Sequence, residues 1–317
     1  MSSTGNSDKN RDTDRAAEFE YDVETAVVTG ATGGVGCWVV DRLADRGVRV
    51  VGIDVDRPSG TRPNAEFRAV DLTDHGETWE TIHEVDPDAV IHFAAISGTL
   101  DDPGTRIFEN NVMSTYNTLV AAGRAGAEIV WTSSQGVYGT LFADEPWLPD
   151  YLPIDEAHEF RPEDPYGTSK VCGEEVAKMV ARRYGVPVTS LRPSTIYAPG
   201  HYRTRPQREN FDLSTDELSG NFWSYVDVRD VVRMVEAALA AEYDGHDAFL
   251  CVADENYLGE NTAEIIEATA GELPDPCDLE GHEAALSNAK AEEVLGWEPV
   301  HAWYDAEETE TSRPRWL

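Results

Sequence analysis

Tyr166 and Lys170 enclose the segment Tyr-Gly-Thr-Ser-Lys, which places a phenol and an amine four residues apart. On a helix this spacing puts both side chains on one face, one turn apart. A lysine ammonium stabilises a phenolate, so we expect it to lower the pKa of Tyr166 below its usual value of about 10. The pair then forms a general base. The same spacing also occurs by chance on solvated helices, so its meaning depends on the motifs around it.

A glycine-rich segment, Thr-Gly-Ala-Thr-Gly-Gly-Val-Gly at 29–36, follows an apolar strand-like run and opens a helical pattern. Glycines let the backbone approach a pyrophosphate, and a helix N-terminus attracts its charge. The setting predicts a dinucleotide site. Its expected members are Gly30, Gly33, Gly34, Val35 and Gly36.

Polar residues follow three further strand-like runs. Asp54 ends the next run, where a carboxylate can bind ribose hydroxyls and repel a 2′-phosphate, so the sequence predicts NAD. Arg57 could meet a 2′-phosphate and leaves NADP open. Asp71 and Leu72 are expected at the adenine edge. Ser134 lies where open α/β sheets bind ligands, beyond the carboxyl end of a strand.

Apolar runs alternate with helical patterns from residue 24 onward, which predicts a doubly wound parallel α/β sheet of the Rossmann type. Expected strands are Thr25–Thr29, Arg49–Asp54, Phe67–Val70, Ala89–Ala94, Ile129–Ser133, Val188–Pro193 and Ala248–Val252. Expected helices are Gly34–Arg46, Trp79–Val85, Arg106–Ala125, Pro165–Tyr184, Asp227–Ala241, Asn261–Thr269 and Ala284–Leu295. We expect a disordered tail at 1–22, a dinucleotide-binding domain at 23–198 plus 224–256, and a small C-terminal α/β substrate lobe at 199–223 plus 257–317.

The chain has 60 acidic and 25 basic residues among its 317, a net charge of −35. A field of this sign repels nucleic acid and anionic membranes, and the composition suggests a surface adapted to molar salt in an extreme halophile. Four dispersed cysteines fit a reducing cytoplasm, and the histidine spacing predicts no metal site. No apolar run is long enough to span a bilayer.

Together these motifs resemble the extended short-chain dehydrogenase/reductase family, also called the NAD-dependent epimerase/dehydratase family, over residues 24–300. Further matching segments are IHFAA (91–95), NNVMSTYNTL (110–119), TSSQGVYG (132–139), LRPSTIYAPG (191–200), YVDVRDVV (225–232) and LSNAKAEEVLGW (286–297). The resemblance implies that Ser134, Tyr166, Lys170 and Asn111 are catalytic. It also places Ala94, Pro193 and Lys170 at the cofactor, and implies a homodimer or homotetramer. Ser114 stands where the family has glycine.

Two departures bear on the substrate. Members that act on nucleotide-linked sugars carry asparagine at the position of Thr195, and a longer insert than the 24 residues between Gly200 and Tyr225. The pattern is more similar to the uronate and aldose 1-dehydrogenases, which predicts oxidation of a free sugar at C1 to a lactone. Expected substrate contacts are then Ser97, Ser134, Gln135, Tyr166, Thr195 and Arg203.

Two other functions stay open. An NDP-sugar 4-epimerase or dehydratase would return the hydride to the sugar, and the short insert argues against it. A non-catalytic member would bind NAD as a sensor or scaffold, and the complete set of serine, tyrosine and lysine argues against that.

Overall fold

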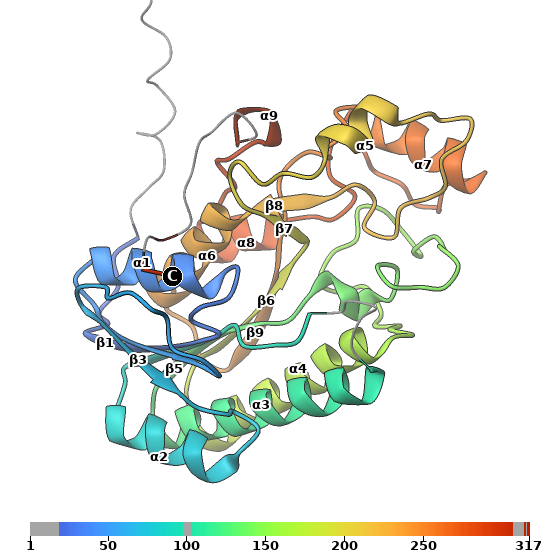
Figure 1. Ribbon diagram of the computed structural model, residues 1–317. Helices are drawn as coiled ribbons and strands as arrows, with labels where there is room; N and C mark the ends of the chain where they lie inside the picture. Colours follow the sequence, from blue (N-terminus) through green and yellow to red (C-terminus); the bar gives the residue numbers. More distant parts are fainter. Residues whose placement is uncertain (1–18, 98–102, 307–313, 315) are drawn as a thin grey trace, which may run out of the picture.

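A seven-stranded parallel sheet forms the centre of the computed structural model, which describes residues 19–97, 103–306, 314 and 316–317 (Figure 1). The strand order is β3-β2-β1-β4-β5-β6-β9, with every neighbouring pair parallel. The strands are β1 (Thr25–Thr29), β2 (Arg49–Asp54), β3 (Ala65–Ala69), β4 (Ala89–His92), β5 (Glu128–Thr132), β6 (Val188–Pro193) and β9 (His246–Cys251). The doubly wound fold predicted from the sequence is confirmed.

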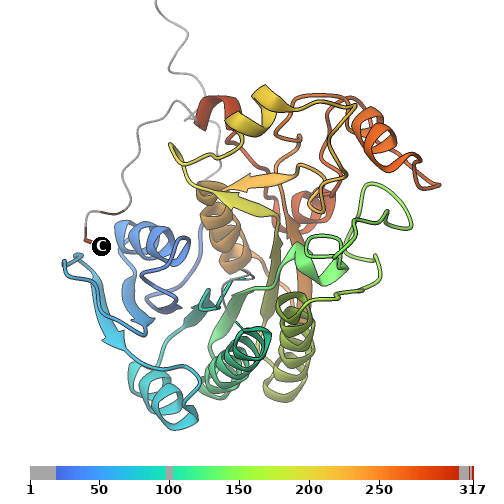
Figure 2. The ribbon, with the colours of Figure 1, turned by 45° about the vertical axis from the view of Figure 1, so that its right-hand side comes forward.

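Helices cover both faces of this sheet, as Figures 1 and 2 show. One face carries α1 (Gly36–Asp45), α6 (Val228–Ala240) and α8 (Ala289–Leu295); the other carries α2 (His75–Val85), α3 (Gly104–Ala125) and α4 (Pro165–Tyr184). Side chains alternate along β1 accordingly: Ala26 and Val28 pack under the first group of helices, and Val27 packs under the second. The central strands β1, β2, β4 and β5 therefore have buried, largely apolar middles, as parallel strands buried on both faces require.

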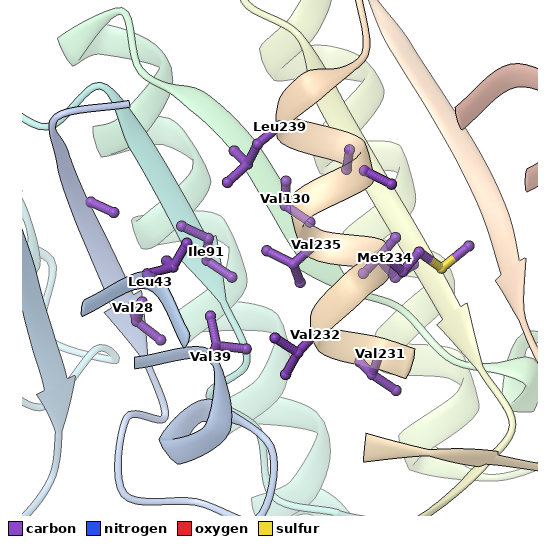
Figure 3. Packing of buried hydrophobic residues seen from close by; sticks show 14 of the residues in the cluster. Val28, Val39, Leu43, Ile91, Val130, Val231, Val232, Met234, Val235 and Leu239 are labelled. Atoms are coloured by element: carbon purple, nitrogen blue, oxygen red, sulfur yellow. The ribbon is translucent and has the colours of Figure 1, made fainter. Parts of the chain in front are cut away.

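Aliphatic side chains fill the space between the sheet and the helices α1 and α6 (Figure 3). Full burial of each such side chain stabilises the fold by about 1.5–3 kcal/mol. Figure 3 labels Val39 and Leu43 of α1, Val231, Val232, Met234, Val235 and Leu239 of α6, and Val28, Ile91 and Val130 of the sheet. This core fixes the first turn of α1, which borders the candidate site.

A second buried cluster lies beyond the carboxyl ends of the strands. It joins residues of 137–160, 202–225 and 250–306, among them Tyr138, Phe222 and Tyr225. The associated elements are β7 (Thr195–Tyr197), which pairs with β8 (Tyr225–Asp227), together with η1 (Gln135–Tyr138), α5 (Arg205–Asn210), α7 (Thr262–Ala270) and α9 (Trp303–Ala306). None of these short elements except α7 was expected from the sequence, because three to six residues are too few to show a period.

Both described chain ends pack on the sheet domain. Phe19 and Tyr21 lie against the first core, and Arg46 donates to the Phe19 carbonyl at 2.8 Å, so residues 19–22 do not belong to a tail. The rest of the expected tail, 1–18, lies outside the described residues. At the other end Trp316 stacks at 4.8 Å from Phe67. No helix of the described chain is long and apolar enough to cross a membrane.

Candidate active site

The glycine-rich loop lies where the strand order reverses, between β1 and β4. A Cβ atom added at Gly30 would come within 2.8 Å of the Ala94 nitrogen, so the loops that follow these two strands touch. Val35, at the N-cap of α1, has no side-chain hydrogen bond to the helix, and the first turn contains no acidic residue. The first turn therefore offers amide groups and a positive dipole end to an anion, which fits the predicted pyrophosphate.

Gly36 provides the sharpest test of this loop. Its added Cβ would lie 2.1 Å from the Gly30 carbonyl oxygen. Relieving this clash requires a movement of the backbone, which is energetically costly. We expect Gly36→Ala to open the loop, lower the melting temperature and weaken NAD binding by about tenfold to a hundredfold, which corresponds to the cost of overpacking. Calorimetric titration with NAD would measure the loss.

Gly34→Ala is the matched control, because a Cβ at Gly34 would meet no atom within 4 Å. We expect it to keep the wild-type melting temperature. If Gly36→Ala bound NAD as tightly as the wild-type protein does, the tight loop would have no role in cofactor binding.

Two aspartates lie at the carboxyl ends of neighbouring strands: Asp54 is the last residue of β2, and Asp71 follows β3 by two residues. Asp54 accepts hydrogen bonds from the backbone nitrogen and the hydroxyl of Thr32 at 2.9 and 2.7 Å, and one from the Val55 nitrogen. Asp71 accepts from the nitrogen and hydroxyl of Thr73, and these bonds lower its pKa. Both aspartates line the same cavity as the glycines. Asp54 thus ties the glycine-rich loop to the place expected for the adenosine ribose.

Tyr166 and Lys170 reach this cavity from α4. The helix starts as the sequence predicts: Asp164 accepts from the Gly167 nitrogen at 2.8 Å, and Pro165 occupies the first turn. Lys170 is almost fully buried and donates to the Thr132 carbonyl at 2.7 Å. Both side chains line a cavity of about 580 Å³ that also contains the glycine-rich loop and Asp54. A volume of this size is typical of cofactor sites.

Burial dominates the ionisation of the pair. It lowers the pKa of Lys170 to about 7. It also raises the pKa of Tyr166, against the opposing effect of a hydrogen bond with Ser134. The expected depression of the tyrosine pKa by lysine is therefore wrong for the protein alone, because removal of the phenol from water has the largest effect and raises its pKa. Burial thus disfavours the charged form of both groups.

Ser134 and Asn111 are both buried and have different hydrogen-bond partners. Ser134 is buried; its hydroxyl accepts from the Gly136 nitrogen at 3.0 Å and bonds Tyr166. Asn111 is buried in α3, where its side chain accepts from the Ile96 nitrogen at 2.8 Å and donates to the Ile96 carbonyl at 2.9 Å. It therefore fixes the loop after β4. Neither Asn111 nor Ser134 is among the residues that line the cavity.

The remaining expected residues separate into two groups. Ser97, Ala94, Leu72 and the glycine-rich loop line the cavity, whereas Gln135, Pro193, Thr195 and Arg203 do not. The Gln135 side-chain oxygen is buried without a partner among the described residues. Thr195 accepts from the Asn221 amide at 3.0 Å, and Arg203 is exposed. An amide thus lies beside Thr195, supplied by a residue 26 positions later in the chain.

Sequence reasoning missed a polar stripe on α3. Arg106, Asn110 and Ser114 recur at every fourth residue and all line the cavity. The spacing of four is the available signal, since it places them on one helix face. Ser114, which stands where the family has glycine, donates to the Asn111 carbonyl at 3.3 Å.

A buried ion pair lies next to the catalytic candidates. Glu174 follows Lys170 by one turn on α4 and receives two hydrogen bonds from Arg192 at 2.8 and 2.7 Å. The same carboxylate accepts from the hydroxyl of Ser133, the neighbour of Ser134, and Arg192 also donates to the Tyr138 hydroxyl. The network links α4 to the ends of β5 and β6. It therefore fixes the position of Tyr166, which lies on α4, relative to Ser134, which follows β5.

His92 is the buried last residue of β4, and its burial makes the stability of the fold depend on pH. Its ring bonds the hydroxyls of Thr29 at 2.7 Å and Thr115 at 3.2 Å. Burial, with a smaller effect of the Lys170 charge, lowers its pKa from 6.5 to about 3. Between these values the unfolded chain binds the extra proton and the folded chain does not, so stability falls as the pH falls. We expect this histidine to contribute a slope of up to about 1.4 kcal/mol per pH unit.

Urea unfolding at several pH values between 3 and 6.5 would measure the slope. His92→Gln should flatten the pH dependence relative to wild type, and the exposed His75→Gln should leave it unchanged. Equal slopes in wild type and His92→Gln would show that His92 does not resist protonation.

Comparisons with known proteins agree on the fold and the family. The NAD dependent epimerase/dehydratase family matches residues 26–250. A UDP-glucose 4-epimerase of Mycolicibacterium smegmatis is 30% identical over 86% of this chain and 93% of its own length. A protein of Methanocaldococcus jannaschii named putative UDP-glucose 4-epimerase is 34% identical to this chain. The match covers 54% of this chain and 55% of the length of that relative. An Agrobacterium tumefaciens short-chain dehydrogenase/reductase superfamily protein, solved with NAD bound, is 27% identical with a TM-score of 0.69 over 90% of this chain and 95% of its own.

These findings overturn the expected oxidation of a free sugar at C1. The curated relatives are named as enzymes of nucleotide-linked sugars. They include UDP-glucose 4-epimerases, a dTDP-L-rhamnose 4-epimerase and a dTDP-glucose 4,6-dehydratase. A mutated uronate dehydrogenase, 23% identical with a TM-score of 0.64 over 90% of this chain and 86% of its own, shares the fold alone. The prediction rested on the missing asparagine and the short insert. Neither observation excludes a nucleotide: Asn221 brings an amide to Thr195, and the second core supports the insert from the C-terminal segments.

Proposed function

The chain belongs to the NAD dependent epimerase/dehydratase family, and from this premise we propose that it is an NAD-dependent 4-epimerase of nucleoside-diphosphate sugars. One observation carries the proposal: Tyr166, Lys170, the glycine-rich loop and Asp54 line a single cavity. The relatives named UDP-glucose 4-epimerase support the substrate class.

Positive charge near the second core supports a diphosphate ligand. The segment 201–208 contains Arg203, Arg205 and Arg208, in a chain whose net charge is −35. The Arg208 guanidinium lies 3.8 Å from the centre of the Trp303 ring, which anchors this segment to α9. We assign the diphosphate of the substrate to this segment, because arginine forks match phosphate oxygens. Residues 199–223 and 257–317 would then form the substrate lobe.

The residues at the cavity fit NAD. The open first turn of α1 would hold the pyrophosphate, Asp54 would bind the adenosine ribose, and Asp71 and Leu72 would meet the adenine edge. When bound, NAD would supply the acceptor and donor of a hydride at C4 of the sugar.

Tyr166 would take the proton of the C4 hydroxyl as a general base. The Lys170 ammonium would stabilise the phenolate, and the Ser134 hydroxyl would donate a hydrogen bond to the developing charge on the C4 oxygen. Once the ring of the 4-keto sugar has rotated so that its opposite face is presented, Tyr166 would return the proton to that oxygen. The buried position of Lys170 and Ser134 would keep water from this exchange.

Product analysis in molar KCl would test the proposal. Purified protein with catalytic NAD should interconvert UDP-glucose and UDP-galactose with no net NADH, as followed by anion exchange and by absorbance of the nicotinamide. A 4-keto-6-deoxy product would indicate a dehydratase. No change in any UDP- or dTDP-hexose would reject the proposed function.

Exposed apolar side chains on α3 support a further proposal about assembly. Met113 and Tyr116 are both more than two-fifths exposed, and α3 packs beside α4. We assign a homodimer interface to these two helices. Light scattering would test it, since a monomeric mass at micromolar concentration would contradict it.

A further inference from the structure

Phe142 places an exposed ring against the base. It lies in the loop between η1 and α4 and is 37% exposed. Its ring meets Tyr166 edge-on, with centroids 5.8 Å apart and planes at 85°. Phe142 is not among the described residues that pack into any of the three buried clusters. Its open surface is therefore not part of a core, and it adjoins the ring of Tyr166.

The loop that carries Phe142 is held on two sides. Gly139 has a φ of +95°, and an added Cβ there would come within 2.0 Å of the Arg161 carbonyl oxygen. Thr140 is buried, and a Cβ at Gly220 would lie 2.3 Å from the Thr140 carbonyl oxygen. These close backbone contacts join the loop both to the segment before α4 and to the insert at 199–223. These contacts therefore hold the loop, and with it Phe142, between Tyr166 and the proposed substrate lobe.

Glycine at position 136 keeps the surface beside Tyr166 and Ser134 free of a side chain. An added Cβ there would lie 3.3 Å from the Ser134 hydroxyl oxygen and 3.7 Å from a ring carbon of Tyr166. A base must come within about 2.6–3.2 Å of the oxygen that it deprotonates. A sugar ring bound at that distance from the Tyr166 hydroxyl comes within reach of Phe142, whose apolar surface suits the C–H face of a pyranose.

We propose that Phe142 is a specificity-determining residue that packs against the C–H face of the hexose ring of the nucleotide sugar. The inference rests on the proposed function and adds a contact to it. Phe142 recognises the sugar and not the nucleotide. A Phe142 that merely supported Tyr166 would affect turnover without affecting binding of the sugar.

Equilibrium binding to the NAD-loaded protein tests this contact. Phe142→Ala should weaken UDP-glucose by about tenfold, the size of a lost aromatic contact, and leave the affinities for UDP and NAD unchanged. Phe142→Trp, which keeps an aromatic surface, should bind UDP-glucose within about threefold of wild type. Val294→Ala, an exposed apolar site on α8, should match wild type for all three ligands. Melting temperatures would show that each variant is folded.

The outcomes separate this proposal from the function on which it rests. Equal losses for UDP and UDP-glucose in Phe142→Ala, or no loss for either, would overturn the sugar contact and leave the proposed function intact. A wild-type protein that binds UDP-glucose without turning it over would reject the 4-epimerase while the variants still decide the contact. A wild-type protein that binds neither ligand would overturn both.

Discussion

Tyr166→Phe is expected to lower kcat for sugar-nucleotide conversion by about 10²- to 10⁴-fold, the range of a lost general base. The ring and its contact with Phe142 remain, while the hydroxyl that bonds Ser134 is removed. Affinity for NAD should stay within about threefold, because the loss falls on the transition state alone. Steady-state kinetics and calorimetric titration with NAD would measure the two effects.

Tyr184→Phe is the matched control, since it makes the same change at the far end of α4. It should retain wild-type kcat. A Tyr166→Phe variant with a kcat within a few-fold of Tyr184→Phe would remove Tyr166 from the role of base.

Breaking the buried pair of Glu174 and Arg192 is expected to produce the largest loss of stability. Both side chains are at most 5% exposed and joined by two hydrogen bonds. Arg192→Met would leave the Glu174 carboxylate buried without its partner, at a cost of about 3–5 kcal/mol in the free energy of unfolding. Such a loss is a large part of the stability of an ordinary domain. Urea unfolding in molar KCl would measure it.

Two further variants make this result specific. The double replacement Glu174→Leu with Arg192→Met removes both charges and should recover most of the stability, since an apolar pair often replaces a buried ion pair without loss. Arg161→Met, which breaks an exposed pair with Asp150, should cost about 1 kcal/mol or less. If Arg192→Met were as stable as Arg161→Met, the buried network would not hold the ends of β5 and β6 to α4.

The sequence predicts the sheet domain well because its signals are local. β1, β2, β6 and α4 have the expected bounds: the strands are short apolar runs, and α4 is marked by Asp164 and Pro165 at one end and Gly185 at the other. β4 ends at His92, two residues earlier than expected, because the chain then turns into the cavity. α8 starts at Ala289, not at 284, since Leu286 is engaged in an isolated bridge with Ile154.

The site is predicted in part, and the missing part depends on contacts between distant segments. The glycine-rich loop, Asp54, Tyr166 and Lys170 carry recognisable spacing and do share one cavity. The contact of Asn221 with Thr195 and that of Phe142 with Tyr166 have no sequence signal, because each joins segments more than 20 residues apart. The substrate was misjudged for the same reason: the length of the insert does not reveal which segments support it.

The pKa values of Tyr166 and Lys170 show another limit of predictions made from residue spacing. A separation of four residues fixes the proximity of Tyr166 and Lys170, and from it we expected a lower pKa for the phenol. Burial depends on the whole fold, and it moves the pKa of Tyr166 upward and that of Lys170 downward to about 7. The fold, and not the spacing alone, therefore sets the charge of the pair.

The return of a hydride to the sugar is the central claim, and a deuterium label tests it most directly. UDP-galactose carrying deuterium at C4 would be incubated with the protein and catalytic NAD in molar KCl, and the products followed by mass spectrometry and NMR. We predict UDP-glucose that retains the deuterium at C4, with no deuterated NADH accumulating. Deuterium that collects in NADH while the sugar stays oxidised would contradict the account.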